Sequence, residues 1–193
     1  MHQRGEVLFS PRVDQLDKVR TQLFDLSLIG VYPDGVGYGN VSIRSGTGCV
    51  ISGTATGGIR VLGQAGYCEV VRFDLQQNLV HTVGPVPASS EAMTHCAIYA
   101  ADERVNCVLH IHSESLWQRL LEYGSSRTAK EIEYGTPEMA EAIANCVREI
   151  NSESGVIVMA GHVEGVVAYG TSIQNAFREI RTLVEDQQSR RHK

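Results

Sequence analysis

Apolar residues near the start of the chain recur every three or four positions, at Leu16, Val19, Leu23 and Leu26. This spacing places their side chains on one face of a helix. Ser10 followed by Pro11 is typical of a helix start, because serine caps free backbone N–H groups and proline fits the first turn. The pattern predicts a helix over residues 11–28, which we expect to cover a sheet.

From Gly35 to Thr82 the pattern changes to short runs that are rich in β-branched residues and are separated by glycine-rich turns. Such runs are typical of antiparallel strands and hairpins. The Gln-Gln-Asn sequence at residues 76–78 is a predicted turn. The predicted strands are residues 41–44, 49–52, 68–73 and 78–82.

Capping residues predict four helices in the second half of the chain. Serine and threonine accept hydrogen bonds from the free N–H groups at a helix start, and glycine often follows a helix end because it adopts left-handed backbone angles. The expected helices run from a cap at Ser89 or Ser90 to about Glu103, from Ser113 to Gly124, from Thr136 and Pro137 to about Ile150, and from about Ser172 to Gln187.

Two mainly apolar runs, Val105 to Ile111 and residues 155–160, predict buried strands between these helices. No internal repeat and no break in composition marks a second domain. The order of elements therefore predicts one α/β domain over residues 1–193, with a mostly antiparallel central sheet flanked by helices.

Composition favours a soluble globular protein. Of 193 residues, 42% are hydrophobic and 20% are charged, which is enough for a sizeable core. The first residues lack a basic segment followed by an apolar run, and no stretch approaches the ~18 apolar residues of a membrane span. We therefore expect a cytoplasmic protein that does not interact with membranes.

Charge and residue usage exclude further classes of function. The net charge of -5 gives no basic field for nucleic acid, and the basic cluster at residues 190–193 is predicted to be a solvated tail. The five cysteines include no Cys-x-x-Cys pair, which favours reduced, mostly buried thiols over a cysteine metal site. None of the three lysines, Lys18, Lys130 and Lys193, lies in an apolar run, so Schiff-base chemistry is not expected.

Three histidines have spacings that suit a mononuclear metal site. His110 and His112 are two positions apart on a predicted strand, so they share one face while Leu109 and Ile111 face the core. His162 follows the second apolar run and is expected on a neighbouring strand end. Three imidazoles with an open fourth position are typical of a catalytic zinc site.

Five motifs occur in order along the chain, and together they resemble the class II aldolase/adducin superfamily over about residues 13 to 187. This superfamily includes the small zinc-dependent sugar-phosphate lyases typified by fuculose-1-phosphate aldolase. The motifs are Gly39-Asn40-Val41-Ser42, the turn from Ser52 to Gly57, Ser89-Ser90-Glu91, His110-Ile111-His112-Ser113, and Gly161-His162 followed by Gly165 and Gly170.

The resemblance implies a metal centre and a catalytic carboxylate. By this resemblance, His110, His112 and His162 bind zinc, and Glu91 is the catalytic acid/base that also ligates the resting metal. The same division of labour follows from chemistry: zinc stabilises the enediolate left by cleavage of a ketose, and a carboxylate moves the protons. Glu91 also lies at a predicted helix start, where the helix dipole favours its ionised form.

A phosphorylated sugar substrate is also implied. Hydroxyl and backbone N–H groups at a helix start or a glycine turn form an anion site. By resemblance, the substrate phosphate is bound by Asn40, by the turn at Gly53 with Thr54 or Thr56, and by Ser89 and Ser90. The resemblance further implies a cyclic homotetramer with active sites at the subunit contacts.

The chain departs from fucose-type aldolases in its tyrosines and in one loop. Those enzymes use two tyrosines for proton transfer, and here Tyr123 or Tyr134 could substitute. Tyr134 is the better candidate because it adjoins a predicted helix start. A two-residue excess, Val163-Glu164, could alter the rim of the metal site.

The reaction remains open within the superfamily. We expect an aldolase-type lyase acting on a phosphorylated ketose or a related sugar-acid phosphate, because similar epimerases carry aspartate at the position of Glu91. Thr94-His95 and Ile98-Tyr99, in contrast, look like those epimerases, although His95 itself is expected to be structural. The alternatives are an epimerase, a dehydratase or a decarboxylase, or a non-catalytic assembly module like the adducin head.

Overall fold

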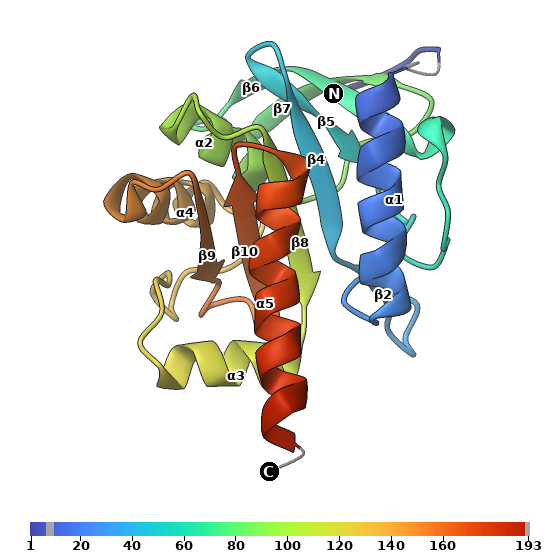
Figure 1. Cartoon of the computed structure of the whole chain (residues 1–193). Coiled ribbons are helices and arrows are strands. Elements are labelled where there is room, and N and C mark those ends of the chain that lie inside the picture. Colours follow the sequence, from blue (N-terminus) through green and yellow to red (C-terminus); the bar gives the residue numbers. More distant parts are fainter. Residues whose placement is uncertain (7–9, 192–193) are drawn as a thin grey trace.

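The computed structural model describes residues 1–6 and 10–191. Its centre is an eight-stranded sheet with helices on both faces (Figure 1). The strands of this sheet are β1 (His2–Arg4), β4 (Asn40–Ser45), β5 (Gly48–Ser52), β6 (Tyr67–Asp74), β7 (Leu79–Gly84), β8 (Cys107–His112), β9 (Ser154–Val158) and β10 (Gly165–Gly170).

From edge to edge the strands lie in the order β1-β7-β6-β5-β4-β8-β10-β9. Every neighbouring pair is antiparallel except β1 with β7, which is parallel. The expected α/β fold is therefore present, but the sheet is mixed. A separate hairpin is formed by β2 (Gly30–Val31) and β3 (Gly37–Tyr38).

The helices form a layer on each face of the sheet (Figure 1). Residues of α1, α3 and α5 share one apolar core with the sheet, and residues of α2 and α4 share a second core with the opposite face. The helices are α1 (Pro11–Asp25), α2 (Ala92–Ala101), α3 (Glu114–Glu122), α4 (Pro137–Ile150) and α5 (Ile173–Arg191), with a short 3-10 helix at Gln64–Gly66.

Strand β8 shows how the alternation of side chains builds both cores. Leu109 and Ile111 pack in the core beneath α1 and α5, whereas Val108 packs in the core beneath α2 and α4. Because strand side chains alternate between faces, His110 and His112 share the face of Val108. Along β8, the two histidines therefore come after Val108, on the same face of the sheet as the second core.

The second half of the chain contains a strand that the sequence analysis missed. Strand β10 pairs with β8 on one side and with β9 on the other, so it is central to the sheet. The strands β1, β2 and β3 were also missed, and each spans only two or three residues. The predicted strand at residues 155–160 ends earlier, at Val158.

Two helix predictions need correction. The first helix ends at Asp25 rather than residue 28, because Ser27 has a left-handed φ of 57°. The N-cap of α2 is Glu91, neither Ser89 nor Ser90, although the Ser89 hydroxyl accepts a hydrogen bond from the Glu91 N–H at 3.4 Å. The helix ends at Ala101 because Asp102 is extended.

The expectations about cysteines and membrane spans can be compared with the described residues. All five cysteines are buried, and none of them forms a disulfide. None of the described helices combines the length and apolar character needed to cross a bilayer. Of the predicted basic tail, residues 190 and 191 belong to α5, and residues 192 and 193 lie outside the described residues.

Candidate metal centre and active site

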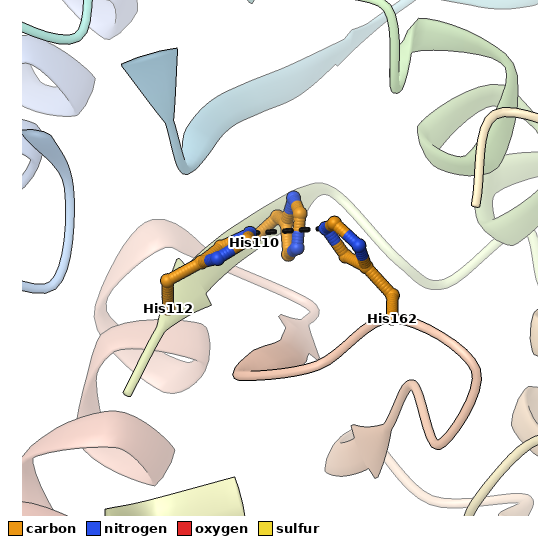
Figure 2. Close-up of side chains that lie close together, drawn as sticks. All are labelled: His110, His112 and His162. Atoms are coloured by element: carbon orange, nitrogen blue, oxygen red, sulfur yellow. Dashed lines mark hydrogen bonds between the residues drawn. The ribbon is translucent and has the colours of Figure 1, made fainter. Parts of the chain in front are cut away.

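The three histidines meet although they come from two separate segments. His110 and His112 project from β8, and His162 lies in the turn between β9 and β10 (Figure 2). One ring nitrogen from each residue lies within 4.8 Å of the other two. The ring centroids are 4.7 to 5.4 Å apart. The predicted triad is thus assembled in the fold.

The turn that carries His162 is held by its own backbone. The His162 N–H donates to the Met159 carbonyl at 3.0 Å, and the Gly165 N–H donates to the His162 carbonyl at 2.8 Å. Gly161 packs directly on a neighbouring loop, where an added Cβ would lie 1.8 Å from the Ile132 carbonyl oxygen. A glycine is therefore required beside His162.

All three imidazoles are held in the neutral form. Burial lowers the pKa of His112 to about 3 and the pKa of His162 to about 4. Burial also holds the pKa of His110 well below its usual range, and repulsion from the neighbouring imidazoles lowers it further. Neutral imidazole is the form that binds a metal ion.

The donor set fits a metal ion with a preference for nitrogen. The Nε2 atoms of His112 and His162 face each other at 3.0 Å, as the dashed line in Figure 2 marks. His110 Nε2 is buried and has no hydrogen-bond partner in the described part of the chain. A buried ring nitrogen without a partner is costly, and three imidazole nitrogens suit zinc.

Glu91 is a buried carboxylate beside this triad. It is 4% exposed, and its Oε2 accepts a hydrogen bond from the Thr94 hydroxyl at 2.9 Å. A backbone hydrogen bond from Gly135 also reaches the carboxylate, while Oε1 has no partner among the described residues. Burial raises the pKa of Glu91. Its oxygens are not part of the 4.8 Å group that the three histidines form.

The triad and Glu91 line one cavity of about 620 Å³, a volume suited to a small molecule. Most of the residues that the sequence indicated for the site contribute to its walls. These residues are Asn40, Gly53, Thr54, Ser89, Ser90, Glu91, His110, His112, Tyr134 and His162.

Apart from Asn40, which begins β4, the residues expected to bind phosphate come from two adjacent turns. The Thr54 N–H donates to the Pro87 carbonyl at 2.9 Å, and the Ser89 N–H donates to the Ser52 carbonyl at 3.3 Å. These bonds join the turn after β5 to the segment before α2. Because the Ser89 N–H is already used, Ser90, which is exposed, has the more accessible polar groups.

The two candidate threonines have different surroundings. The Thr56 hydroxyl is buried and donates to the Gly53 carbonyl at 2.7 Å, which fixes the turn. Thr54 is exposed and lines the cavity. Asn40 is buried, and its amide nitrogen lies 3.3 Å from His110 Nδ1, so it contacts the triad as well as the cavity.

Arg20, which was not identified from the sequence, supports this turn through its hydrogen bonds. Arg20 on α1 is 1% exposed, and its guanidinium donates to three backbone carbonyls of the loop after the turn. The acceptors are Thr56 at 2.8 Å, Ile59 at 2.7 Å and Arg60 at 3.2 Å. A buried arginine that is not among the residues lining the cavity therefore holds this segment.

Tyr134 is the tyrosine that lies nearest the triad among those considered from the sequence. Its ring centroid is 4.3 Å from that of His162, and the residue is 56% exposed. Tyr123 follows α3, is 64% exposed and is not among the described residues that line the cavity. The geometry therefore favours Tyr134 over Tyr123.

Comparison with known proteins agrees with the geometry. Residues 34–186 match the family model of the class II aldolase and adducin N-terminal domain. L-fuculose phosphate aldolase of Methanococcus maripaludis is 30% identical over 161 residues, which cover 76% of this chain and 81% of that protein.

Solved structures share the fold. L-fuculose-1-phosphate aldolase from Thermus thermophilus gives a TM-score of 0.66 at 20% identity, covering 93% of this chain and 92% of that one. YgbL from Klebsiella pneumoniae gives a TM-score of 0.68 at 18% identity, covering 90% of this chain and 85% of that one. That protein is described as an aldolase, an epimerase or a decarboxylase. The chain belongs to the class II aldolase and adducin N-terminal domain family.

Proposed function

We propose that this protein is a zinc-dependent lyase of the aldolase type that cleaves a phosphorylated ketose or a related sugar-acid phosphate. The observation that carries the proposal is the convergence of three neutral imidazoles in the same cavity as a buried carboxylate. The aldolase relative from Methanococcus maripaludis supports this choice of reaction. A bound zinc would supply Lewis-acid stabilisation for the negative charge that develops on substrate oxygens during cleavage.

In this proposal, Glu91 is the acid or base that transfers a proton during cleavage of the substrate. Its Oε1 is the atom without a partner among the described residues, and the hydrogen bond from Thr94 fixes the other oxygen. A pKa raised by burial brings the carboxyl group closer to the working pH of a general acid or base. Tyr134 would exchange a proton with the substrate on the side of His162.

The phosphate binds between the two adjacent turns. Thr54 and Ser90 contribute accessible hydroxyl groups, and Gly53, Ser89 and Asn40 complete the walls around them. Hydroxyl and backbone donors are suited to a phosphate because each hydrogen bond to an ionised oxygen is stronger than one to a neutral group. Of the two candidate threonines, we assign this role to Thr54.

Product analysis of a Glu91→Gln variant tests the proposal. We expect loss of turnover with zinc binding retained, because glutamine keeps the shape of the side chain but cannot accept a proton. NMR spectroscopy would follow the zinc-loaded protein with a panel of ketose phosphates and sugar-acid phosphates. Glu122→Gln, an exposed change on α3, is the matched control.

The products distinguish the alternatives. Triose fragments indicate aldol cleavage, carbon dioxide indicates decarboxylation, loss of water indicates dehydration, and an inverted centre indicates epimerisation. Persistent cleavage by Glu91→Gln would show that another group moves the proton. If the wild-type protein bound no metal and left the whole panel unchanged, a non-catalytic role like that of the adducin head would replace the proposal.

A further inference from the structure

The hydroxyl of Tyr32 links a histidine of the triad to an acidic residue. Tyr32 Oη lies 2.9 Å from His112 Nδ1 and 2.5 Å from Glu164 Oε2. Nothing in the sequence analysis assigned a role to Tyr32, and Glu164 was noted only as part of the two-residue excess. Together with His112, these residues form a chain of hydrogen bonds that starts at the proposed metal centre.

Tyr32 is presented by the small hairpin of β2 and β3. The Tyr32 N–H donates to the Val36 carbonyl at 2.8 Å, and the Gly35 N–H donates to the Tyr32 carbonyl at 2.9 Å. The ring also packs against Tyr38, with centroids 4.5 Å apart. The hairpin thus holds the hydroxyl against His112 from outside the main sheet.

Glu164 is presented by the same turn that carries His162. Its backbone has a left-handed φ of 69°, and its carbonyl accepts from the Ser113 N–H at 3.0 Å. Ser113 directly follows the last residue of β8, so this bond ties the turn to the strand end that carries His112. The position of the Glu164 carboxylate is therefore coupled to the position of the triad.

Proton counting fixes the direction of each hydrogen bond. A carboxylate only accepts, so the single Tyr32 proton is donated to Glu164. The Tyr32 oxygen must then accept from His112, whose Nδ1 carries the proton. Nε2 of His112 is left with its lone pair, and this nitrogen is the one that faces His162.

We propose that Tyr32 and Glu164 are positioning residues that hold the His112 ring with its proton on Nδ1 and its lone pair toward the metal. Partners of this kind fix the orientation of a ligand ring and strengthen it as a donor. The inference rests on the proposed metal site. It extends that proposal by naming the groups that prepare one ligand before any metal binds.

Substitution of Tyr32 by phenylalanine tests the proposal, because only the oxygen is removed. Long-range 1H–15N NMR on histidine-labelled protein would report which nitrogen of His112 carries the proton in the metal-free state. Zinc affinity would be measured by competition with a chelator. We expect Tyr32→Phe to lose the fixed proton position and to weaken zinc binding about 10- to 100-fold.

Two further variants sharpen the result. Glu164→Gln keeps an acceptor oxygen but removes the charge, so we expect a smaller loss of zinc affinity in the same direction. Tyr38→Phe is the matched control on the same hairpin. Its hydroxyl donates to the Ser27 carbonyl at 3.4 Å, and its ring lies 5.5 Å from that of His112, so its removal should leave the His112 proton and the zinc affinity unchanged.

These experiments test the positioning role of Tyr32 and Glu164 separately from the proposed lyase activity. The proposal is wrong if wild-type His112 carries its proton on Nε2, or if Tyr32→Phe matches the wild type in both proton position and zinc affinity. If the expected changes occur but no substrate is cleaved, the positioning role stands and only the lyase activity fails.

Discussion

His95 lies one helical turn after Glu91, but its contacts belong to a separate buried network. Its Nδ1 lies 2.7 Å from the Ser42 hydroxyl, which in turn lies 2.8 Å from the Tyr99 hydroxyl. The side chain is fully buried, and burial lowers its pKa to about 3. These contacts favour the structural role that the sequence analysis preferred for His95.

The low pKa of His95 predicts a loss of stability in mild acid. Below about pH 6.5 the unfolded chain binds a proton at this histidine and the folded protein does not, so the free energy of unfolding falls as the pH falls. The loss reaches about 1.4 kcal/mol per pH unit until the pH approaches the folded pKa. Urea denaturation of metal-free protein at about pH 7.5 and about pH 5.5 would measure it.

A His95→Asn variant isolates this contribution, because asparagine keeps a polar partner for Ser42 and does not titrate. We expect the free energy of unfolding of this variant to depend less on pH than that of the wild type. The difference should correspond to the uptake of about one proton on unfolding at the lower pH. His81→Asn, on strand β7, controls for the removal of a histidine at another place in the fold. Equal pH dependence in wild type and His95→Asn would contradict the prediction.

Apart from Tyr134, the site residues found from the sequence share one property: each lies in a short motif with a recognisable spacing. His110 and His112 were placed on one face by strand alternation alone, and the fold agrees. Tyr32 and Glu164 carry no such local signal. Tyr32 is 80 positions away from His112 and 132 positions away from Glu164, so these contacts depend on tertiary structure.

Three helix starts were predicted correctly because capping is local. Ser10, Ser113 and Thr136 each accept a hydrogen bond from a backbone N–H two or three residues later, as their spacing indicated. Strand β10 had no local signal of this strength. It is as long as β8, but its flanking glycines, Gly165 and Gly170, were interpreted as motif residues rather than strand ends.

The sequence of helix α1 contains a signal that could have revealed the contacts between Arg20 and the segment from Thr56 to Arg60. Arg20 lies on the same helical face as Leu16 and Leu23, where a charged side chain is unusual. Arg20→Met should lower the free energy of unfolding by about 2–4 kcal/mol, because three loop carbonyls lose their donor. Urea denaturation would measure the change.

Arg60→Met provides the matched control for that prediction. Arg60 belongs to the same loop, but its salt bridge with Asp25 is exposed, with side chains 58% and 45% accessible. Exposed ion pairs of this kind contribute about 1 kcal/mol or less. If Arg20→Met cost no more than Arg60→Met, Arg20 would not be holding the loop.

For the whole molecule, we propose a cyclic homotetramer, which is what the family resemblance implies. A cyclic assembly would bring a second chain to each active-site cavity, whose rim includes the exposed Tyr134. Sedimentation velocity of the purified chain at micromolar concentration should show one species of about four times 21.1 kDa. A monomer that cleaves substrate would show that the cavity needs no neighbour.

The cavity as a whole was beyond sequence reasoning because distant segments supply its walls. The β2–β3 hairpin, the turn after β5, the start of α2, the end of β8 and the turn before β10 all contribute. Each motif predicted its own chemistry. Only the sheet order, in which β8 lies between β4 and β10, determines that these motifs face one another.

The order of strands in the sheet also determines when each strand can find its neighbours during synthesis. Strand β8 can pair with β4 as soon as both have left the ribosome, but its other neighbour, β10, comes much later in the chain. Because domains complete their folding only when such late partners arrive, His110 and His112 emerge well before the turn that carries His162. A metal site that needs all three histidines can therefore be completed only late in the making of this protein.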